Sequence, residues 1–244
     1  MKRAALLIML IFLTTPKSGG RKPMHLTEIL NAPAPAALTY LALGDSYTIG
    51  ESVARSQCFP HQLAVKLQEN GVSVAAAPRI IARTGWTAEE LQTALDAEKI
   101  TERFNLVTLL IGVNNQFRRY SPDAYQKTFR LLLQRAVSLA GGIHRHVFVL
   151  SIPDWGSTPY GLESGRGRPV ISSQIDQFNA INREEARKAG ISYTDITPES
   201  RLALFNPSLV APDGLHPSGL MYKHWVNALY PAVLKGLGYP YRHP

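Results

Sequence analysis

The sequence predicts an α/β protein whose sheet is mainly parallel. From residue 38 to about residue 235, short apolar runs that suit buried strands alternate about five times with segments that carry helical signals. Such alternation is typical of a parallel sheet of about five strands with helices on both faces. With 244 residues, 45% of them hydrophobic, the chain can bury the core of one such domain.

The N-terminal segment before this domain has the pattern of an export signal. Residues 1–20 begin with Lys2 and Arg3, continue with ten apolar residues and end in small residues. Ten apolar residues are too few to span a bilayer, and an uncleaved anchor is the alternative. Cleavage after residue 20 would remove three basic residues and no acidic one, so the net charge would fall from +8 to +5. We therefore expect a periplasmic or secreted protein, with residues 21–37 as a proline-containing linker or arm and the domain at 38–244.

The distribution of basic residues gives no indication of a nucleic-acid partner, and the cysteine content excludes an internal disulfide. The basic residues are scattered, and neither a basic stripe nor a nucleic-acid-binding motif is present. Cys58 is the only cysteine, so no internal disulfide can form. The sequence does not indicate the oligomeric state.

The first strand is predicted at residues 38–43, and it ends abruptly at Gly44-Asp45-Ser46. Thr87 and Glu90 fit a capping box, which predicts a helix opening after Thr87. The other elements predicted in this half are a loop at 47–57, a helix at 59–68 and short strands at 72–76 and 79–82.

In the second half, the clearest strand is residues 104–111, followed by a turn at Gly112-Val-Asn-Asn115. Ser121 and Pro122 suit the N-cap and first position of a helix that runs to about residue 140. Pro217 is predicted to open the last helix. The other expected elements are strands at 146–152 and 191–196, a helix at 170–189, and irregular segments at 153–169 and 197–216.

Polar residues follow the predicted strands at four corners that should meet at one rim of the sheet. They are Ser46, Gly85, the pair Asn114 and Asn115, and Asp213 with His216. Acyl transfer needs a nucleophile, a base, a group that orients the base, and donors for the oxyanion.

Each role has a candidate. His216 can act as base, and the three-residue spacing lets Asp213 reach one of its ring nitrogens. Gly85 can bring its backbone N–H close to a substrate, and Asn114 can donate its amide to an oxyanion. Taken alone, Gly85 and Asn114 fit an ordinary loop glycine and turn residue better than a functional role, whereas the Asp213–His216 segment favours a functional role over a turn.

Taken together, the four motifs resemble the SGNH hydrolases, also called the GDSL esterase/lipase family. The matching segments, in family order, are Gly44-Asp-Ser46, Gly85 in Arg-Thr-Gly-Trp, Gly112-Val-Asn-Asn115 and Asp213-Gly-Leu-His-Pro217. The resemblance implies Ser46 as nucleophile, His216 as base oriented by Asp213, and an oxyanion hole formed by Ser46, Gly85 and Asn114. It also implies a flavodoxin-like three-layer α/β/α sandwich and no metal or organic cofactor.

Two positions depart from the family pattern. Tyr47 stands where the family name has Leu, and Asn115 stands where Asp is more common. Trp86, Asn115 and Trp155 are candidate substrate-binding residues. Trp86 and Trp155, with Phe117, Tyr120 and Tyr160, could form an acyl- or sugar-binding wall or merely pack the loops.

The resemblance implies hydrolysis of carboxylic esters, on a short-acyl, O-acetyl saccharide or lysophospholipid substrate. The motifs do not separate these substrates. A catalytically silent glycan- or lipid-binding module and an acyltransferase that uses the same site are the alternatives. His144 and His146 could in principle bind a metal, but they lie at a predicted helix-to-strand connection without a nearby Cys or acidic ligand, so we expect no metal site there.

Overall fold

The computed structural model describes residues 37–75 and 77–240. The predicted export signal and all but the last residue of the predicted arm lie outside these described residues. Within them, no helix is both long enough and apolar enough to cross a membrane.

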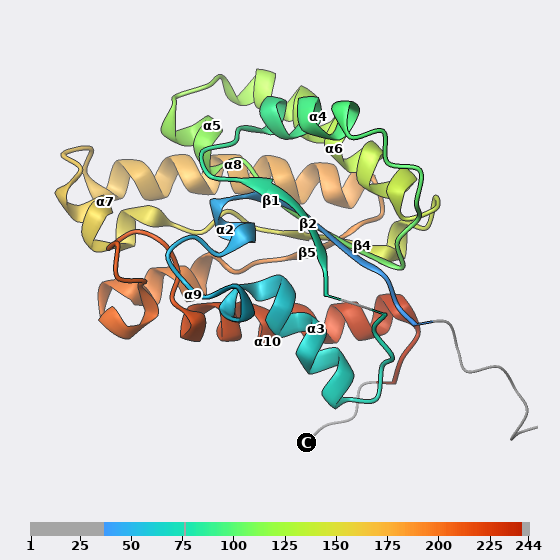
Figure 1. Ribbon diagram of the computed structural model, residues 1–244. Helices are drawn as coiled ribbons and strands as arrows, with labels where there is room; N and C mark the ends of the chain where they lie inside the picture. Colours follow the sequence, from blue (N-terminus) through green and yellow to red (C-terminus); the bar gives the residue numbers. More distant parts are fainter. Residues whose placement is uncertain (1–36, 76, 241–244) are drawn as a thin grey trace, which may run out of the picture. The chain divides into compact units, whose positions relative to one another are not determined.

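The centre of the domain is a five-stranded, entirely parallel sheet with the order β2-β1-β3-β4-β5 (Figure 1). The strands are β1 (Tyr40–Asp45), β2 (Arg79–Arg83), β3 (Leu106–Leu110), β4 (Val147–Leu150) and β5 (Ser192–Thr194). This is the flavodoxin-like order, in which the direction of winding reverses between β1 and β3. The predicted fold class is therefore confirmed.

Helices cover both faces of the sheet (Figure 1). One layer contains α4 (Ala88–Ala97), α6 (Pro122–Leu139) and α8 (Arg168–Lys188), and the other contains α3 (Phe59–Glu69) and α10 (Gly219–Leu237). Four short helices lie in the loops: α2 (Ser46–Ile49), α5 (Val113–Phe117), α7 (Pro159–Glu163) and α9 (Thr197–Arg201).

Burial explains why β1, β3 and β4 lack alternation between apolar and polar residues. Every residue of these three strands is buried, because helices pack on both sides of them. Gly44 in β1 is required by packing rather than by its own backbone angles. A Cβ there would lie 2.3 Å from the Leu110 carbonyl oxygen and 2.1 Å from Thr48 Oγ1.

The long helices and the strands of the sheet lie close to their predicted positions, but the strand predicted at 72–76 is wrong, because within its described residues only Val74 pairs, in a single bridge with Leu38. The irregular segments contain structure that we did not predict. The loop predicted after Ser46 begins with α2, and the turn at 112–115 leads into α5. The segments 153–169 and 197–216 contain α7 and α9. These helices have only four or five residues, too few to show a helical period in sequence.

The capping predictions have mixed outcomes. The Thr87 capping box is confirmed, with Thr87 N–H donating to Glu90 Oε2 at 2.8 Å and Glu90 N–H donating to Thr87 Oγ1 at 3.4 Å. Ser121 is at the N-cap of α6 but makes no side-chain cap. Pro217 does not open the last helix: Ser218 caps α10 by accepting from Met221 N–H.

Candidate active site

The site lies at the carboxyl ends of β1 and β3, where the winding of the sheet reverses. Ser46 is the first residue of α2, directly after β1, and Asn114 is in α5, after β3. Parallel strands bring both to the same edge of the sheet. Ser46 is buried, with 5% of its surface exposed.

One cavity of about 160 Å³ gathers most of the predicted site residues. Ser46, Gly85, Asn114 and His216 all line it, although they come from four separate segments of the chain. The rest of the lining is formed by Tyr47, Thr84, Val113, Phe117, Trp155, Tyr160 and Leu215. The cavity thus has a polar edge and a largely aromatic and aliphatic wall.

Asp213 and His216 form the pair that the spacing predicted. His216 Nδ1 donates to Asp213 Oδ2 at 2.6 Å, and the N–H groups of Leu215 and His216 donate to Asp213 Oδ1 at 2.9 Å each. Partial burial would raise the pKa of Asp213. Hydrogen bonds from Ser52, His216 and the two backbone groups outweigh it and hold this pKa well below its ordinary value. The carboxylate is therefore charged, and it leaves Nε2 of His216 for other chemistry.

The two other predicted oxyanion donors lie on loops fixed by hydrogen bonds. Gly85 has a φ of +82°, and within the described chain its N–H has no hydrogen-bond acceptor. The Gly85 carbonyl accepts from Arg118 at 2.7 Å. Asn114 Nδ2 donates one hydrogen to the Trp86 carbonyl at 2.9 Å, and its second amide hydrogen remains for a ligand.

Asp45, between Gly44 and Ser46, is completely buried. Its Oδ1 accepts from Tyr47 N–H at 3.0 Å and so caps α2, while Oδ2 has no partner among the described residues. Burial raises the pKa of Asp45 from 3.8 to about 8, against the effect of the backbone hydrogen bonds. Its contacts thus make Asp45 a structural group of the loop that follows β1.

Of the three predicted substrate-binding residues, only Trp155 lines the cavity. Asn115 is fully buried, with Oδ1 accepting from Ala88 N–H at 2.9 Å and Nδ2 donating to Glu89 at 2.7 Å. Both polar ends of its amide are thus used to hold the start of α4, and the prediction that Asn115 binds substrate is wrong. Trp86 packs against the core and does not line the cavity.

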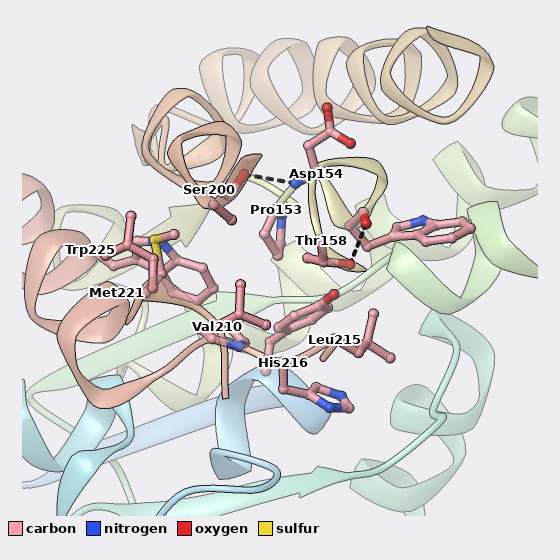
Figure 2. Close-up of a pocket in the computed structure, with 14 residues that line it drawn as sticks. Pro153, Asp154, Thr158, Ser200, Val210, Leu215, His216, Met221 and Trp225 are labelled. Carbon is pink, nitrogen blue, oxygen red and sulfur yellow. Dashed lines mark hydrogen bonds between the residues drawn. The ribbon is translucent and has the colours of Figure 1, made fainter. Parts of the chain in front are cut away.

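Tyr47, which stands where the family name has Leu, packs against His216, the candidate base. It is 3% exposed, and its ring centroid lies 5.4 Å from that of His216. A second, much smaller cavity of about 20 Å³ is also lined by Tyr47 and His216, with Leu215, Met221 and Trp225 around it (Figure 2). Its volume is about that of one water molecule.

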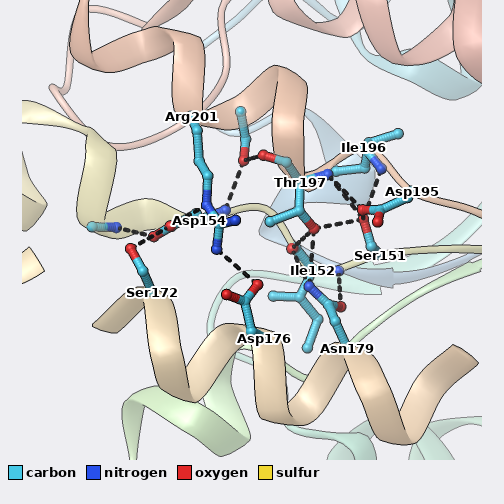
Figure 3. Close-up of polar contacts among 12 residues, drawn as sticks. Ser151, Ile152, Asp154, Ser172, Asp176, Asn179, Asp195, Ile196, Thr197 and Arg201 are labelled. Carbon is cyan, nitrogen blue, oxygen red and sulfur yellow. Dashed lines mark hydrogen bonds and ion pairs between the residues drawn. The ribbon is translucent and has the colours of Figure 1, made fainter. Parts of the chain in front are cut away.

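The loop after β4, which supplies Trp155, is held by a polar network centred on the buried side chain of Asp154 (Figure 3). Asp154 accepts from Arg201 Nε at 2.8 Å, from Ser172 Oγ at 2.6 Å and from Gly156 N–H at 3.0 Å. Arg201 also pairs with Asp176 at 2.7 Å. Because Asp154 is buried and paired, the network fixes this loop relative to α8 and α9.

Three functional neighbours were not identified from the sequence. Arg118 donates to the Gly85 carbonyl. Glu51 accepts a hydrogen bond from Thr84, and Ser52 donates one to Asp213. The only sequence signal for the last two is their position just after the Gly-Asp-Ser motif. The described part of the chain contains no cluster of three or more His, Cys, Asp or Glu side chains that could hold a metal.

These observations define a class: a three-layer α/β/α protein whose sheet edge gathers a serine, a paired histidine and aspartate, and free N–H donors. The chain belongs to the GDSL-like lipase/acylhydrolase family, whose model matches residues 42–224. It is therefore a carboxylic ester hydrolase of this family, and the resemblance to SGNH hydrolases is confirmed.

Solved structures support the same fold. The chain is similar to TesA, with 19% identity and a TM-score of 0.62 over 82% of this chain and 99% of TesA. The acetylxylan esterase Axe2 from Geobacillus stearothermophilus shares 19% identity, with a TM-score of 0.59 over 83% of this chain and 95% of Axe2. The psychrotrophic esterase EstA from Pseudoalteromonas sp. shares 15% identity, with a TM-score of 0.62 over 82% and 98%. A search of curated proteins finds no match.

Proposed function

We propose that the protein hydrolyses short-acyl carboxylic esters through an acyl-enzyme on Ser46. The observation that carries this proposal is the single cavity lined by Ser46, Gly85, Asn114 and His216, with Asp213 bonded to the histidine. A nucleophile, a base, an orienting carboxylate and oxyanion donors are the groups that acyl transfer requires.

In the proposed reaction, Ser46 Oγ attacks the ester carbonyl carbon while His216 Nε2 takes the hydroxyl proton. The N–H groups of Ser46 and Gly85 and the amide of Asn114 donate to the oxyanion. When the carbon–oxygen bond of the ester breaks, His216 gives its proton to the leaving alcohol. Water then attacks the acyl-enzyme with His216 as base, which releases the acid and restores Ser46.

The size of the cavity favours a short acyl group. An engineered apolar cavity of about 150 Å³ in another protein holds a benzene molecule, so the roughly 160 Å³ here suits an acyl chain of similar bulk. A palmitoyl chain is far larger. Phe117, Trp155 and Tyr160 supply aromatic surface that could pack on a short acyl group or on a sugar ring. Axe2, described as an acetylxylan esterase, has the same fold, which is compatible with an O-acetyl saccharide substrate.

The test is hydrolysis of p-nitrophenyl esters from acetate to palmitate by the wild type and Ser46→Ala. We expect acetate and butyrate to be preferred, and the activity of Ser46→Ala to fall by a factor on the order of 10⁴ or more. Ser138→Ala, which changes an exposed serine on α6, is the matched control and should behave like the wild type.

Equal rates in the wild type and Ser46→Ala would remove Ser46 from the reaction. A serine-directed fluorophosphonate then separates two cases. Labelling of Ser46 would indicate a working nucleophile with the wrong substrate, whereas no labelling would favour a silent binding module. Analysis of products with an added acceptor alcohol distinguishes hydrolysis from acyl transfer.

We also propose export, on the basis of the basic and apolar pattern of residues 1–20. The intact mass of the protein recovered from the periplasm or medium tests this proposal. Loss of about 20 residues supports a cleaved signal, and the full-length mass in a membrane fraction supports an anchor.

A further inference from the structure

The turn that follows the nucleophile is built directly on the backbone of Ser46. The N–H groups of Gly50 and Glu51 both donate to the Ser46 carbonyl at 3.1 Å, and Val53 N–H donates to the Gly50 carbonyl at 3.2 Å. The position of this turn is therefore tied to the position of Ser46.

Two neighbouring side chains of the turn reach the other two loops of the site. Glu51 accepts a hydrogen bond from the hydroxyl of Thr84, the residue before Gly85. Ser52 Oγ donates to Asp213 Oδ2 at 2.6 Å, across 161 residues of sequence. The turn thus joins the nucleophile to the oxyanion loop on one side and to the aspartate on the other.

Ser52 donates to the same Asp213 oxygen that accepts from the imidazole of His216. Asp213 Oδ2 is the atom that accepts from His216 Nδ1, also at 2.6 Å, whereas Oδ1 accepts only backbone N–H groups. Two donors on one carboxylate oxygen fix the rotation of the carboxylate. They also share its negative charge between the hydroxyl and the imidazole.

The backbone at Ser52 is in a conformation that serine rarely adopts. Its φ is +64°, in the left-handed region that favours glycine. A glycine there would remove the backbone strain but also the hydroxyl. Strained non-glycine residues persist at functional sites where the surroundings hold them, and here the bond to Asp213 provides such a hold.

We propose that Ser52 is a positioning residue for the Asp213–His216 pair. Its hydroxyl keeps Asp213 Oδ2 aimed at His216 Nδ1 and keeps the pair in register with Ser46. Ser52 does not touch the substrate, and it neither gains nor loses a proton in the reaction. The inference rests on the proposed function of Ser46, Asp213 and His216.

The informative variant is Ser52→Gly, because it removes the hydroxyl while the backbone can keep its left-handed angles, which glycine adopts without strain. We expect kcat/KM for p-nitrophenyl acetate to fall about ten- to a hundredfold, mainly in kcat, as for loss of one hydrogen bond to a charged group. Loss of the Ser52 hydrogen bond also leaves more of the Asp213 charge facing the imidazole, so the acidic limb of the kcat/KM profile should differ from that of the wild type. The melting temperature should stay the same or rise, because the strain is relieved.

Lys99→Gly is the matched control. Lys99 also has a positive φ, +44°, but lies in the exposed connection between α4 and β3, at the opposite edge of the sheet. This variant should leave kcat/KM and the pH profile unchanged. A Ser52→Gly enzyme with kcat/KM within twofold of the wild type and an unchanged acidic limb would overturn the proposal. A loss of activity accompanied by a clear fall in melting temperature would also overturn the proposal, because it would indicate that Ser52 has a purely structural role.

A readout that does not depend on turnover separates this inference from the proposed function. The low-field Nδ1–H resonance of His216 in the proton NMR spectrum reports the bond to Asp213 directly. We expect it to shift or broaden in Ser52→Gly and to stay in place in Lys99→Gly. An unchanged resonance in Ser52→Gly would overturn the inference about Ser52, whether or not the wild type hydrolyses any of the esters tested. A wild type that hydrolyses none of them would count against the proposed function, not against this inference.

Discussion

Asp45 and Asp213 both stand beside a proposed catalytic side chain, but their surroundings are opposite. Asp45 is completely buried, and its Oδ2 has no partner among the described residues. The side chain of Asp213 is 28% exposed and accepts four hydrogen bonds. Burial raises the pKa of Asp45 to about 8, whereas the hydrogen bonds hold the pKa of Asp213 below its ordinary range. The number of donors thus separates a carboxylate able to stabilise an imidazolium from one that caps a helix.

The strongest test of this difference between the two carboxylates is to remove the charge of Asp213. We expect Asp213→Asn to lower kcat/KM for p-nitrophenyl acetate by a factor on the order of 10³ to 10⁴. The amide can present an N–H to His216 Nδ1 and then favours the wrong tautomer. Folding is checked by circular dichroism. A loss smaller than tenfold would mean that Asp213 does not orient the base.

Asp45→Asn should have a much smaller effect on activity. Asparagine has nearly the same shape, and its Oδ1 can still accept from Tyr47 N–H and cap α2. We expect kcat/KM to fall by less than about tenfold, as for a structural neighbour that makes no contact with the reacting atoms. If the same assay gave a loss equal to that of Asp213→Asn, the two carboxylates would no longer differ in role.

The two carboxylates should also differ in how stability depends on pH. The pKa of Asp45 is raised on folding, so the folded protein holds a proton that the unfolded chain releases above about pH 4. This single group therefore lowers the free energy of unfolding as pH rises from about 4 to 8, by at most about 1.4 kcal/mol per pH unit. Urea unfolding at pH 5 and pH 8 measures the effect.

Asp45→Asn should remove that contribution, so its stability relative to the wild type should improve at pH 8. Asp213 behaves in the opposite sense, because its lowered pKa contributes stability above about pH 4 that is lost in acid. Asp213→Asn should therefore remove the part of the stability that the wild type loses in acid, below about pH 4. Equal pH dependence in the wild type and Asp45→Asn would show that Asp45 is charged when folded.

The smallest expected effect concerns Thr48, which is buried in the same helix that Asp45 caps. Its hydroxyl has no hydrogen-bond partner in the described part of the protein. Thr48→Val should leave the free energy of unfolding unchanged or raise it by up to about 1 kcal/mol, because a buried unpaired hydroxyl is replaced by a methyl group. A clear loss of stability in urea unfolding would indicate a bound water there, and Asp45 would then not lie in a dry environment.

The local parts of the site were predictable because their partners are close in sequence. Asp213 and His216 are three residues apart, and Gly214 between them has a φ of +73° that lets the chain turn tightly. The capping box of Thr87 and Glu90 was found for the same reason. In these cases the hydrogen bonds depend on local backbone geometry, which the residue types largely determine.

The contacts that were missed join distant segments. Asn114 and Asn115 are adjacent and chemically identical, but one faces the cavity while the other is buried against α4. Ser52 and Asp213 are 161 residues apart, and no spacing rule connects them. Pro217 looked like a helix start, but it pairs with Val210 in a β-bridge before Ser218 caps α10.

The parallel α/β architecture and the family follow from the amino-acid sequence alone, and the sequence also predicts Ser46, Asp213 and His216 as residues of the proposed site. These depend on apolar periodicity and on short motifs that require particular residue types. The three-dimensional arrangement was needed to learn which side chains line the cavity, which carboxylate stays charged, and that Ser52 reaches Asp213. Burial and hydrogen bonding between distant segments exist only once the sheet has brought its loops together, so local sequence patterns do not encode them.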